Sequence, residues 1–349
     1  MSVLNVGRLL RRTQLYADQP AVTDLGTGWR ATYGEHLARV AATVAGLRSI
    51  GIESTDRVAI LAGSTHQYVE LWHAGLAGGF IICPLNNRFT LDELVAVTAD
   101  AGCVALIHDD EHAELANAIA ARAASVERRI PLDGASHGGG AGSTTGLETL
   151  IGQAMGAELP PEPAESAPAA LIYTGGTTGR PKGVLHRQRS IVAQIMRIQM
   201  TCSAEPDHAL LSIMPMFHIG SIAAWGWFWP SGGHSYLLPA FEPGEVLRAV
   251  SEHSITVLPG VPTMFAMLLD HPDFEPELVS SLQMAFYGAA PMWPELLARL
   301  LDVNPDLRFF QAYGTTETGG GVTMLRPEFH TIDDVSRLGS VGRPDLDVE

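Results

Sequence analysis

Cysteine and positive charge are both scarce in this sequence of 349 residues. Its three cysteines, Cys83, Cys103 and Cys202, are far apart and form no CxxC pair. We therefore expect reduced core residues in a cytoplasmic protein, and neither a disulfide framework nor a zinc site. Lys and Arg total 22 against 38 Asp and Glu, which gives a formal net charge of -16 with no basic run. This balance disfavours nucleic acid and anionic membrane surfaces as partners and favours small ligands.

Long uninterrupted apolar stretches are also missing. Residues 210–229 come nearest to the length of a bilayer span, but Pro215, His218 and Gly226 interrupt them and no Lys or Arg flanks them. Residues 1–17 contain arginines among leucines but no apolar signal-peptide core. We therefore expect neither a transmembrane segment nor a secretion signal.

The sequence does contain a regular alternation of strand and helix patterns. Its length and its hydrophobic content of 46% favour two or more packed units. Strands are expected at 58–62, 80–84, 104–107, 210–215, 233–239, 256–259 and 284–287. Helices are expected at 37–47, 68–77, 91–101, 147–155, 243–252, 262–269 and 294–301, and loops at 134–146 and 157–170. This order predicts an α/β fold with mostly parallel sheets covered by helices.

The most informative segment runs from Tyr173 to Gly183 and reads YTGGTTGRPKG. Glycines let backbone N–H groups approach phosphate oxygens, threonine hydroxyls add donors, and Lys182 adds a positive charge. An ordinary surface turn needs only one or two glycines, so we predict a phosphate-binding loop. Its predicted ligand-binding residues are Thr174, Gly175, Gly176, Thr177, Thr178, Gly179 and Lys182.

This loop differs from a Walker loop. Pro181 precedes Lys182 and Gly183 follows it, which disfavours a helix start at that point. An earlier echo, GSTTG at 142–146, lacks the following Arg-Pro-Lys-Gly and is expected to be a linker.

The loop resembles the signature of the adenylate-forming superfamily, which includes acyl-CoA synthetases, adenylation domains of peptide synthetases and luciferases. Glycine stands at 175 and 176, where one position is usually serine. Further segments resemble motifs of that superfamily in the expected order, at 214–218, 287–291, 311–317 and 339–344. With the pattern between residues 33 and 87, the resemblance covers nearly the whole chain.

The resemblance implies an architecture and a missing part. It implies two packed α/β subdomains in αβαβα layers, at 1–165 and 166–335, and the start of a small β-barrel near the C-terminus. Residues 336–349 are expected to be the start of a truncated region. Members of the superfamily continue beyond this point into a small mobile domain that carries a catalytic lysine. We therefore expect this chain to be the large N-terminal part of such an enzyme, impaired in catalysis.

The nucleotide site implied by the resemblance combines two regions. Tyr313 would stack on adenine with residues 288–290 opposite, Thr316 would contact the α-phosphate, and Glu317 with Thr174 would hold Mg²⁺. Glu317 could instead be a solvated carboxylate. The implied nucleotide-binding residues beyond the loop are Gly288, Ala289, Ala290, Gln311, Ala312, Tyr313, Gly314, Thr315 and Thr316, and the implied catalytic residues are Lys182, His218, Thr316 and Glu317.

The acid pocket is implied at Phe217, His218, Trp225, Gly288 and Gly314, although His218 could also be an ordinary core or loop histidine. Members of the superfamily that activate amino acids place an Asp in this segment to pair with the ammonium group, and none stands between residues 215 and 230. The resemblance therefore implies an apolar acid rather than an amino acid. Trp225 and Trp229 are four residues apart and are expected to share one helix face, as pocket wall or as plain core.

The implied activity is ATP-dependent conversion of a fatty or aryl acid to acyl-AMP and then to acyl-CoA, with ATP, Mg²⁺ and coenzyme A. A homodimer is a further expectation. Two alternatives remain open. One is a nucleotide-binding module without catalysis, and the other is a different adenylating ligase, such as a luciferase-like enzyme or a fatty-acyl-AMP ligase.

Overall fold

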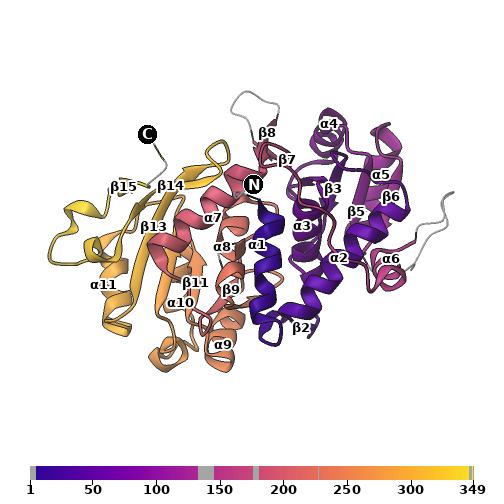
Figure 1. Cartoon of the computed structure of the whole chain (residues 1–349). Helices are drawn as coiled ribbons and strands as arrows, with labels where there is room; N and C mark the ends of the chain where they lie inside the picture. The colour runs from indigo at the N-terminus through magenta and orange to yellow at the C-terminus, as the bar shows by residue number, and fades with distance from the viewer. Residues whose placement is uncertain (1–4, 133–144, 176–180, 227, 346–347, 349) are drawn as a thin grey trace. The chain divides into compact units, whose positions relative to one another are not determined.

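The computed structural model describes residues 5–132, 145–175, 181–226, 228–345 and 348, with the side chains of residues 223–225 left out (Figure 1). The chain divides into two compact units. The first contains residues 1–19, 31–193 and 216–218, and the second contains residues 20–30, 194–215 and 219–349. The subdomain limits expected from the sequence, 1–165 and 166–335, stay predictions.

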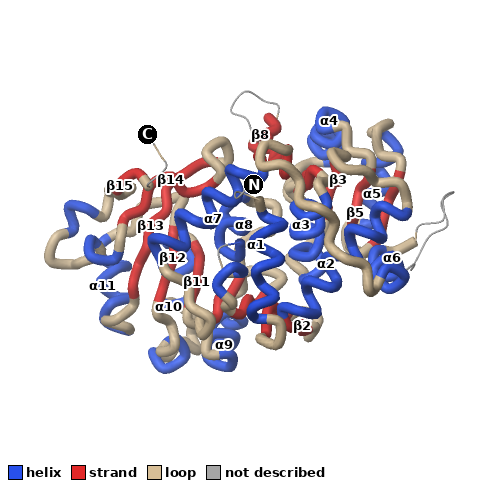
Figure 2. The backbone as a smooth tube through the Cα atoms, viewed as in Figure 1, coloured by secondary structure: helices blue, strands red, loops and turns tan. Residues whose placement is uncertain are grey.

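Strands and helices alternate through the first unit (Figure 2). In its described part, six strands form one sheet in the order β6-β5-β3-β4-β7-β8. Neighbours are parallel except for the antiparallel pair β7–β8. The elements are α1 (Val6–Arg12), α2 (Tyr33–Ser49), β3 (Arg57–Leu61), α3 (His66–Gly78), β4 (Ile81–Pro84), α4 (Leu91–Ala101), β5 (Ala105–His108), α5 (Ala113–Arg122), β6 (Arg128–Pro131), α6 (Leu147–Ala154), β7 (Pro168–Thr174) and β8 (Lys182–Arg187).

Both faces of this sheet are covered, as strand β4 illustrates. Side chains alternate along a strand. Cys83 belongs to the core formed with α4 and α5, whereas Ile82 lies against Gly75 of α3. A β-carbon at position 75 would collide with the Ile82 side chain, so the glycine sets how closely α3 packs.

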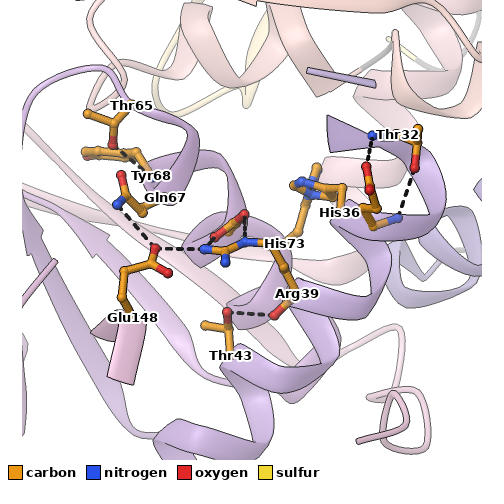
Figure 3. Close-up of polar contacts among 11 residues, drawn as sticks. Thr32, His36, Arg39, Thr43, Thr65, Gln67, Tyr68, His73 and Glu148 are labelled. Carbon is orange, nitrogen blue, oxygen red and sulfur yellow. Dashed lines mark hydrogen bonds and ion pairs between the residues drawn. The ribbon is translucent and has the colours of Figure 1, made fainter. Parts of the chain in front are cut away.

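Capping boxes explain where two helices of the first unit begin. Thr32 accepts from the Glu35 backbone N–H at 3.2 Å, and the Glu35 carboxylate accepts from the Thr32 N–H at 2.8 Å (Figure 3). Thr90 and Glu93 repeat the arrangement at the start of α4. The Thr-x-x-Glu spacing satisfies backbone donors that the first helical turn leaves open.

The second unit is built on a nine-stranded sheet among the described residues, in the order β15-β14-β13-β12-β11-β9-β10-β1-β2. The pairs from β13 through β12, β11, β9 and β10 to β1 are parallel, and β13–β14 and β14–β15 are antiparallel. The elements are β1 (Pro20–Asp24), β2 (Arg30–Thr32), α7 (Gln188–Cys202), β9 (Ala209–Ser212), α8 (Ile219–Gly226), β10 (His234–Leu237), α9 (Pro243–His253), β11 (Val257–Gly260), α10 (Pro262–Leu269), β12 (Met284–Tyr287), α11 (Pro294–Val303), β13 (Arg308–Thr315), β14 (Gly320–Leu325) and β15 (Arg343–Pro344). β2 and α7 each have residues in both units.

Helices α9, α10 and α11 cover one face of the nine-stranded sheet. Val246, Phe265 and Leu297, one from each helix, share a buried core with Leu258 of β11 and Phe309 of β13. Such a contiguous apolar core holds the central strands at fixed spacing. The loops at the ends of β12 and β13 therefore follow strands that a buried core holds in place.

The predicted fold class is confirmed, because mostly parallel sheets carry helices in both units. The three cysteines are buried and free. Two expectations are wrong. The expected loop at 157–170 gives way to β7 at Pro168, and α8 ends at Gly226, so Trp229 starts a separate 3-10 turn instead of sharing a helix face with Trp225. A β-barrel starting near the C-terminus stays a prediction.

A helix that crosses a membrane must be long and apolar. Among the described residues, none of the helices is long and apolar enough for that purpose.

Candidate active site

The first half of the candidate site lies at the tip of the β7–β8 hairpin in the first unit. Thr174, the last residue of β7, pairs with Lys182, the first residue of β8. As expected, a strand and no helix begins at Lys182. Gly175 and Lys182 are exposed. The predicted phosphate-binding residues Gly176, Thr177, Thr178 and Gly179 lie outside the described residues.

Tyr173 fixes the base of this hairpin. Its hydroxyl donates to Asp100 Oδ2 of α4 at 2.5 Å, and partial burial together with this bond raises the pKa of Tyr173. A β-carbon at Gly183 would lie 2.9 Å from the Tyr173 ring, so only glycine lets the strand pass so close. Asp100 could not be predicted from the sequence, because a contact between a strand and a distant helix leaves no local pattern.

The second half of the candidate site lies where β12 and β13 end in the second unit. The strands are parallel, with Tyr287 beside Gln311, so the segments that follow them meet at the same edge of the sheet. A β-carbon at Gly288 would lie 2.7 Å from the Ala312 carbonyl oxygen. The structure thus brings Gly288 close to Ala312, one residue from each of the two segments predicted to enclose adenine.

The backbone departs from regular geometry at this edge. Ala289 has a φ of 64°, a left-handed conformation that a non-glycine residue rarely adopts. The β13–β14 register shifts between Tyr313 and Gly314, and the Tyr313 side chain is 51% exposed. Bulges of this kind re-aim side chains next to functional sites. The exposed Tyr313 ring is suited to stacking on a planar base.

Thr318 shapes the turn between β13 and β14. Its hydroxyl accepts from the Thr315 N–H at 2.9 Å and lies 2.8 Å from the Gly320 carbonyl oxygen. The turn is thereby held in one shape, with Glu317 at its exposed tip and Thr316 half-buried beside it. A hydroxyl and a carboxylate next to each other are groups that phosphate and Mg²⁺ accept as partners.

His330 forms a hydrogen bond with Tyr287, the last residue of β12. His330 Nδ1 lies 3.0 Å from the Arg326 carbonyl oxygen, which can only accept, so Nδ1 carries the proton and Nε2 accepts from the Tyr287 hydroxyl at 2.9 Å. Burial lowers the pKa of His330 to about 4, which keeps this neutral tautomer. Tyr287 immediately precedes Gly288, so the bond restrains the predicted adenine-binding turn.

The predicted acid-binding residues are divided between the units. Phe217 and His218 belong to the first unit, Gly288 and Gly314 to the second, and the Trp225 side chain is not described. His218 is exposed, although neighbouring atoms partly desolvate its ring and lower its pKa. Because these residues belong to separate units, their shared role in binding an acid stays a prediction.

The predicted metal ligands also belong to different units, with Thr174 in the first and Glu317 in the second. Within the described ranges, no group of three His, Cys, Asp or Glu side chains is arranged to hold a metal ion. Mg²⁺ at a phosphate site takes most ligands from phosphate and water and only one or two from protein. One carboxylate and one hydroxyl fit that pattern.

Known proteins match the chain over nearly its full length. The family model described as "AMP-binding enzyme" matches residues 9–349. Feruloyl-CoA synthases from Amycolatopsis and Streptomyces species are 34% identical over 342 residues, which covers 96% of this chain and 63% of each relative. A medium/long-chain-fatty-acid–CoA ligase from Mycobacterium tuberculosis is 31% identical over 91% of this chain.

A solved structure agrees with these matches. The inhibitor-bound N-terminal domain of FACL13 from Mycobacterium tuberculosis superposes with a TM-score of 0.89 at 25% identity, covering 99% of this chain and 83% of that one. The present chain spans about three fifths of the length of the first curated relatives, at 63%. The chain belongs to the family of AMP-binding enzymes, the adenylate-forming family that its motifs resemble.

Proposed function

We propose that this chain is the nucleotide- and acid-binding part of an AMP-forming acid–thiol ligase. Its reaction would be ATP-dependent activation of an apolar carboxylic acid to acyl-AMP, followed by transfer to coenzyme A. The observation that carries the proposal is the contact of Gly288 with the Ala312 carbonyl oxygen. That contact joins two backbone segments with an exposed tyrosine into a surface suited to adenine.

The chemistry needs positioned charge more than a covalent nucleophile. An acid carboxylate oxygen attacks the α-phosphorus of ATP, the bond to the bridging oxygen breaks, and pyrophosphate leaves. The thiol of coenzyme A then attacks the acyl carbon and AMP leaves. In this scheme Thr316 and Lys182 stabilise phosphate charge, and Glu317 with Thr174 would hold Mg²⁺, which neutralises the phosphates.

The names of relatives support an acid with a largely apolar body. They include feruloyl-CoA synthases, a medium/long-chain-fatty-acid–CoA ligase and a ligase for a dioxo-octahydroindenyl propanoyl group. The lack of Asp at 215–230 supports the same class. Buried, free thiols at all three cysteines support a location in the reducing cytoplasm.

A stable mimic of the acyl-adenylate tests this function without requiring turnover. We would measure binding of Mg-ATP, of 5′-O-sulfamoyladenosine, and of its N-octanoyl and N-cinnamoyl derivatives by titration calorimetry. An acyl group should tighten binding by about tenfold or more, because apolar burial adds to nucleotide binding. A nucleotide-binding module without acid chemistry would bind ATP and gain nothing from the acyl group, which would contradict the proposal.

A further inference from the structure

Gln194 on α7 is a buried amide that the site described above does not use. Its side chain is only 1% exposed, and its Nε2 has no hydrogen-bond partner among the described residues. A buried donor without a hydrogen-bond partner destabilises the folded state, because it has lost its bonds to water. A ligand that brings a hydrogen-bond acceptor is one way to satisfy such a donor.

The Gln194 amide lies against the turn that carries the predicted catalytic groups. A β-carbon at Gly320 would overlap Gln194 Nε2, and Gly320 has a φ of +107°, which favours glycine. Gly320 also accepts the hydroxyl hydrogen bond of Thr318, which shapes the same turn. The unpaired donor is therefore next to backbone that lies three residues along the chain from Glu317.

The surrounding elements are those expected near the acid. Ile195, the next residue on α7, lies 3.5 Å from the position of a β-carbon on Gly226 at the end of α8. Helix α8 contacts β14, and it begins directly after the predicted acid-binding residues Phe217 and His218 (Figure 1). Gln194, α8 and β14 all belong to the second unit. The amide thus lies among elements of the second unit.

We propose that Gln194 is a specificity-determining residue whose amide N–H donates to an oxygen on the body of the acid. The inference rests on the proposed function and narrows its substrate class to apolar acids that carry a carbonyl, hydroxyl or ether oxygen. An acid without such an oxygen leaves the donor unpaired. Sites built to hydrogen-bond a substrate group discriminate strongly against analogues that lack it.

The test compares pairs of acyl-sulfamoyladenosines that differ only in one oxygen. The pairs are octanoyl with a series of oxo-octanoyl isomers, and cinnamoyl with 4-hydroxycinnamoyl. In the unsubstituted protein, at least one oxygen-bearing member should bind about tenfold more tightly, as expected for one buried hydrogen bond. In Gln194→Met, which keeps volume but lacks a donor, the ratio should fall to about one.

Gln199→Met provides a matched control on the same helix. Gln199 donates to the Ala204 carbonyl oxygen at 3.1 Å and accepts from the Ser231 hydroxyl at 2.9 Å, so its amide is already paired within the protein. This variant should lower the unfolding temperature and preserve the oxygen preference. Gln194→Met should keep the unfolding temperature, since it removes an unsatisfied donor.

The outcomes separate this inference from the function on which it rests. If acyl groups tighten binding but no oxygen-bearing member is preferred, or if Gln194→Met keeps the preference, the Gln194 inference fails and the proposed function stands. If no acyl group tightens binding, the proposed function fails, and the inference fails with it. A preference lost in Gln194→Met but kept in Gln199→Met supports the inference.

Discussion

The guanidinium of Arg39 and the carboxylate of Glu70 form a two-pronged ion pair between α2 and α3. Nε lies 2.6 Å from Oε1 and Nη2 lies 3.0 Å from Oε2, while the Glu70 side chain is fully buried (Figure 3). Arg39 Nη2 also lies 2.7 Å from Glu148 of α6. One arginine therefore ties three helices of the first unit together.

Removing Arg39 should be far more damaging than removing an arginine from a surface pair. Arg39→Met leaves the Glu70 carboxylate buried without its partner, which should cost about 3–5 kcal/mol of unfolding free energy. The control is Arg122→Met, whose partner Asp92 is 83% exposed and whose loss should cost under about 1 kcal/mol. Urea unfolding of both variants gives the comparison. Equal losses would show that the Arg39–Glu70 pair contributes no more than a surface pair.

A buried histidine pair should make the first unit sensitive to acid. His36 Nε2 lies 2.8 Å from His73 Nδ1, and both rings are buried. Burial lowers the pKa of His73 to about 3, and burial followed by the charges of His73, Arg39 and His66 lowers that of His36. The unfolded chain, in which histidine has a pKa of about 6.5, binds more protons between these values. Stability is thus fully present above about pH 6.5 and falls as the pH falls toward 3.

The expected slope is on the order of 1 kcal/mol of unfolding free energy per pH unit for each histidine across that window. Urea unfolding at pH 7.5, 6 and 5 measures it. His73→Gln should flatten the slope because an amide takes up no proton. His253→Gln, at a half-buried position on α9, is the control. An unchanged slope in His73→Gln would remove this pair as the origin of acid sensitivity.

Gly288→Ala tests the contact that carries the proposed function. The added β-carbon would lie 2.7 Å from the Ala312 carbonyl oxygen, so the turn must shift, at a cost of about 1–3 kcal/mol. Mg-ATP affinity should fall together with stability, because the two segments predicted to enclose adenine separate. Gly339→Ala, where no atom lies within 4 Å of the added carbon, should change neither quantity. If Gly288→Ala leaves the Mg-ATP affinity unaltered, adenine does not bind between the segments that contain Gly288 and Ala312.

Local patterns explain why much of the fold could be predicted. Helix α4 has an apolar stripe and a Thr-x-x-Glu start, and the expected 91–101 agrees with Leu91–Ala101. Strand β12 is a short buried run, and the expected 284–287 agrees with Met284–Tyr287. In both cases the residues that determine the element lie within it or beside it.

Other features depend on distant partners and could not be predicted. Helix α7 was missed because polar residues such as Gln188 and Gln194 are buried on it, which breaks the apolar periodicity. Gln188 is satisfied by a bond from Nε2 to the Leu76 carbonyl oxygen, far away in the sequence. For the site, motifs predicted the nucleotide-binding residues, but the contacts of Asp100 and Gln194 arise only from the fold.

Substitutions at Glu317 and His218 should distinguish a residue that binds the metal from a residue that binds the acid. Glu317→Ala should weaken Mg-ATP binding by about tenfold or more, because the carboxylate would act through Mg²⁺ on the phosphates. Binding of ATP in the presence of EDTA, which removes the Mg²⁺, and of the acyl-sulfamoyladenosines, which lack phosphates, should be nearly unaffected. His218→Ala should leave Mg-ATP binding intact and change the affinity ranking of the acyl groups, because a pocket wall discriminates by shape and polarity. Titration calorimetry measures the affinity of each variant for each of these ligands. Weakening of every ligand by Glu317→Ala would contradict its role as a metal ligand, and a uniform effect of His218→Ala on all acyl groups would contradict its place in the acid pocket.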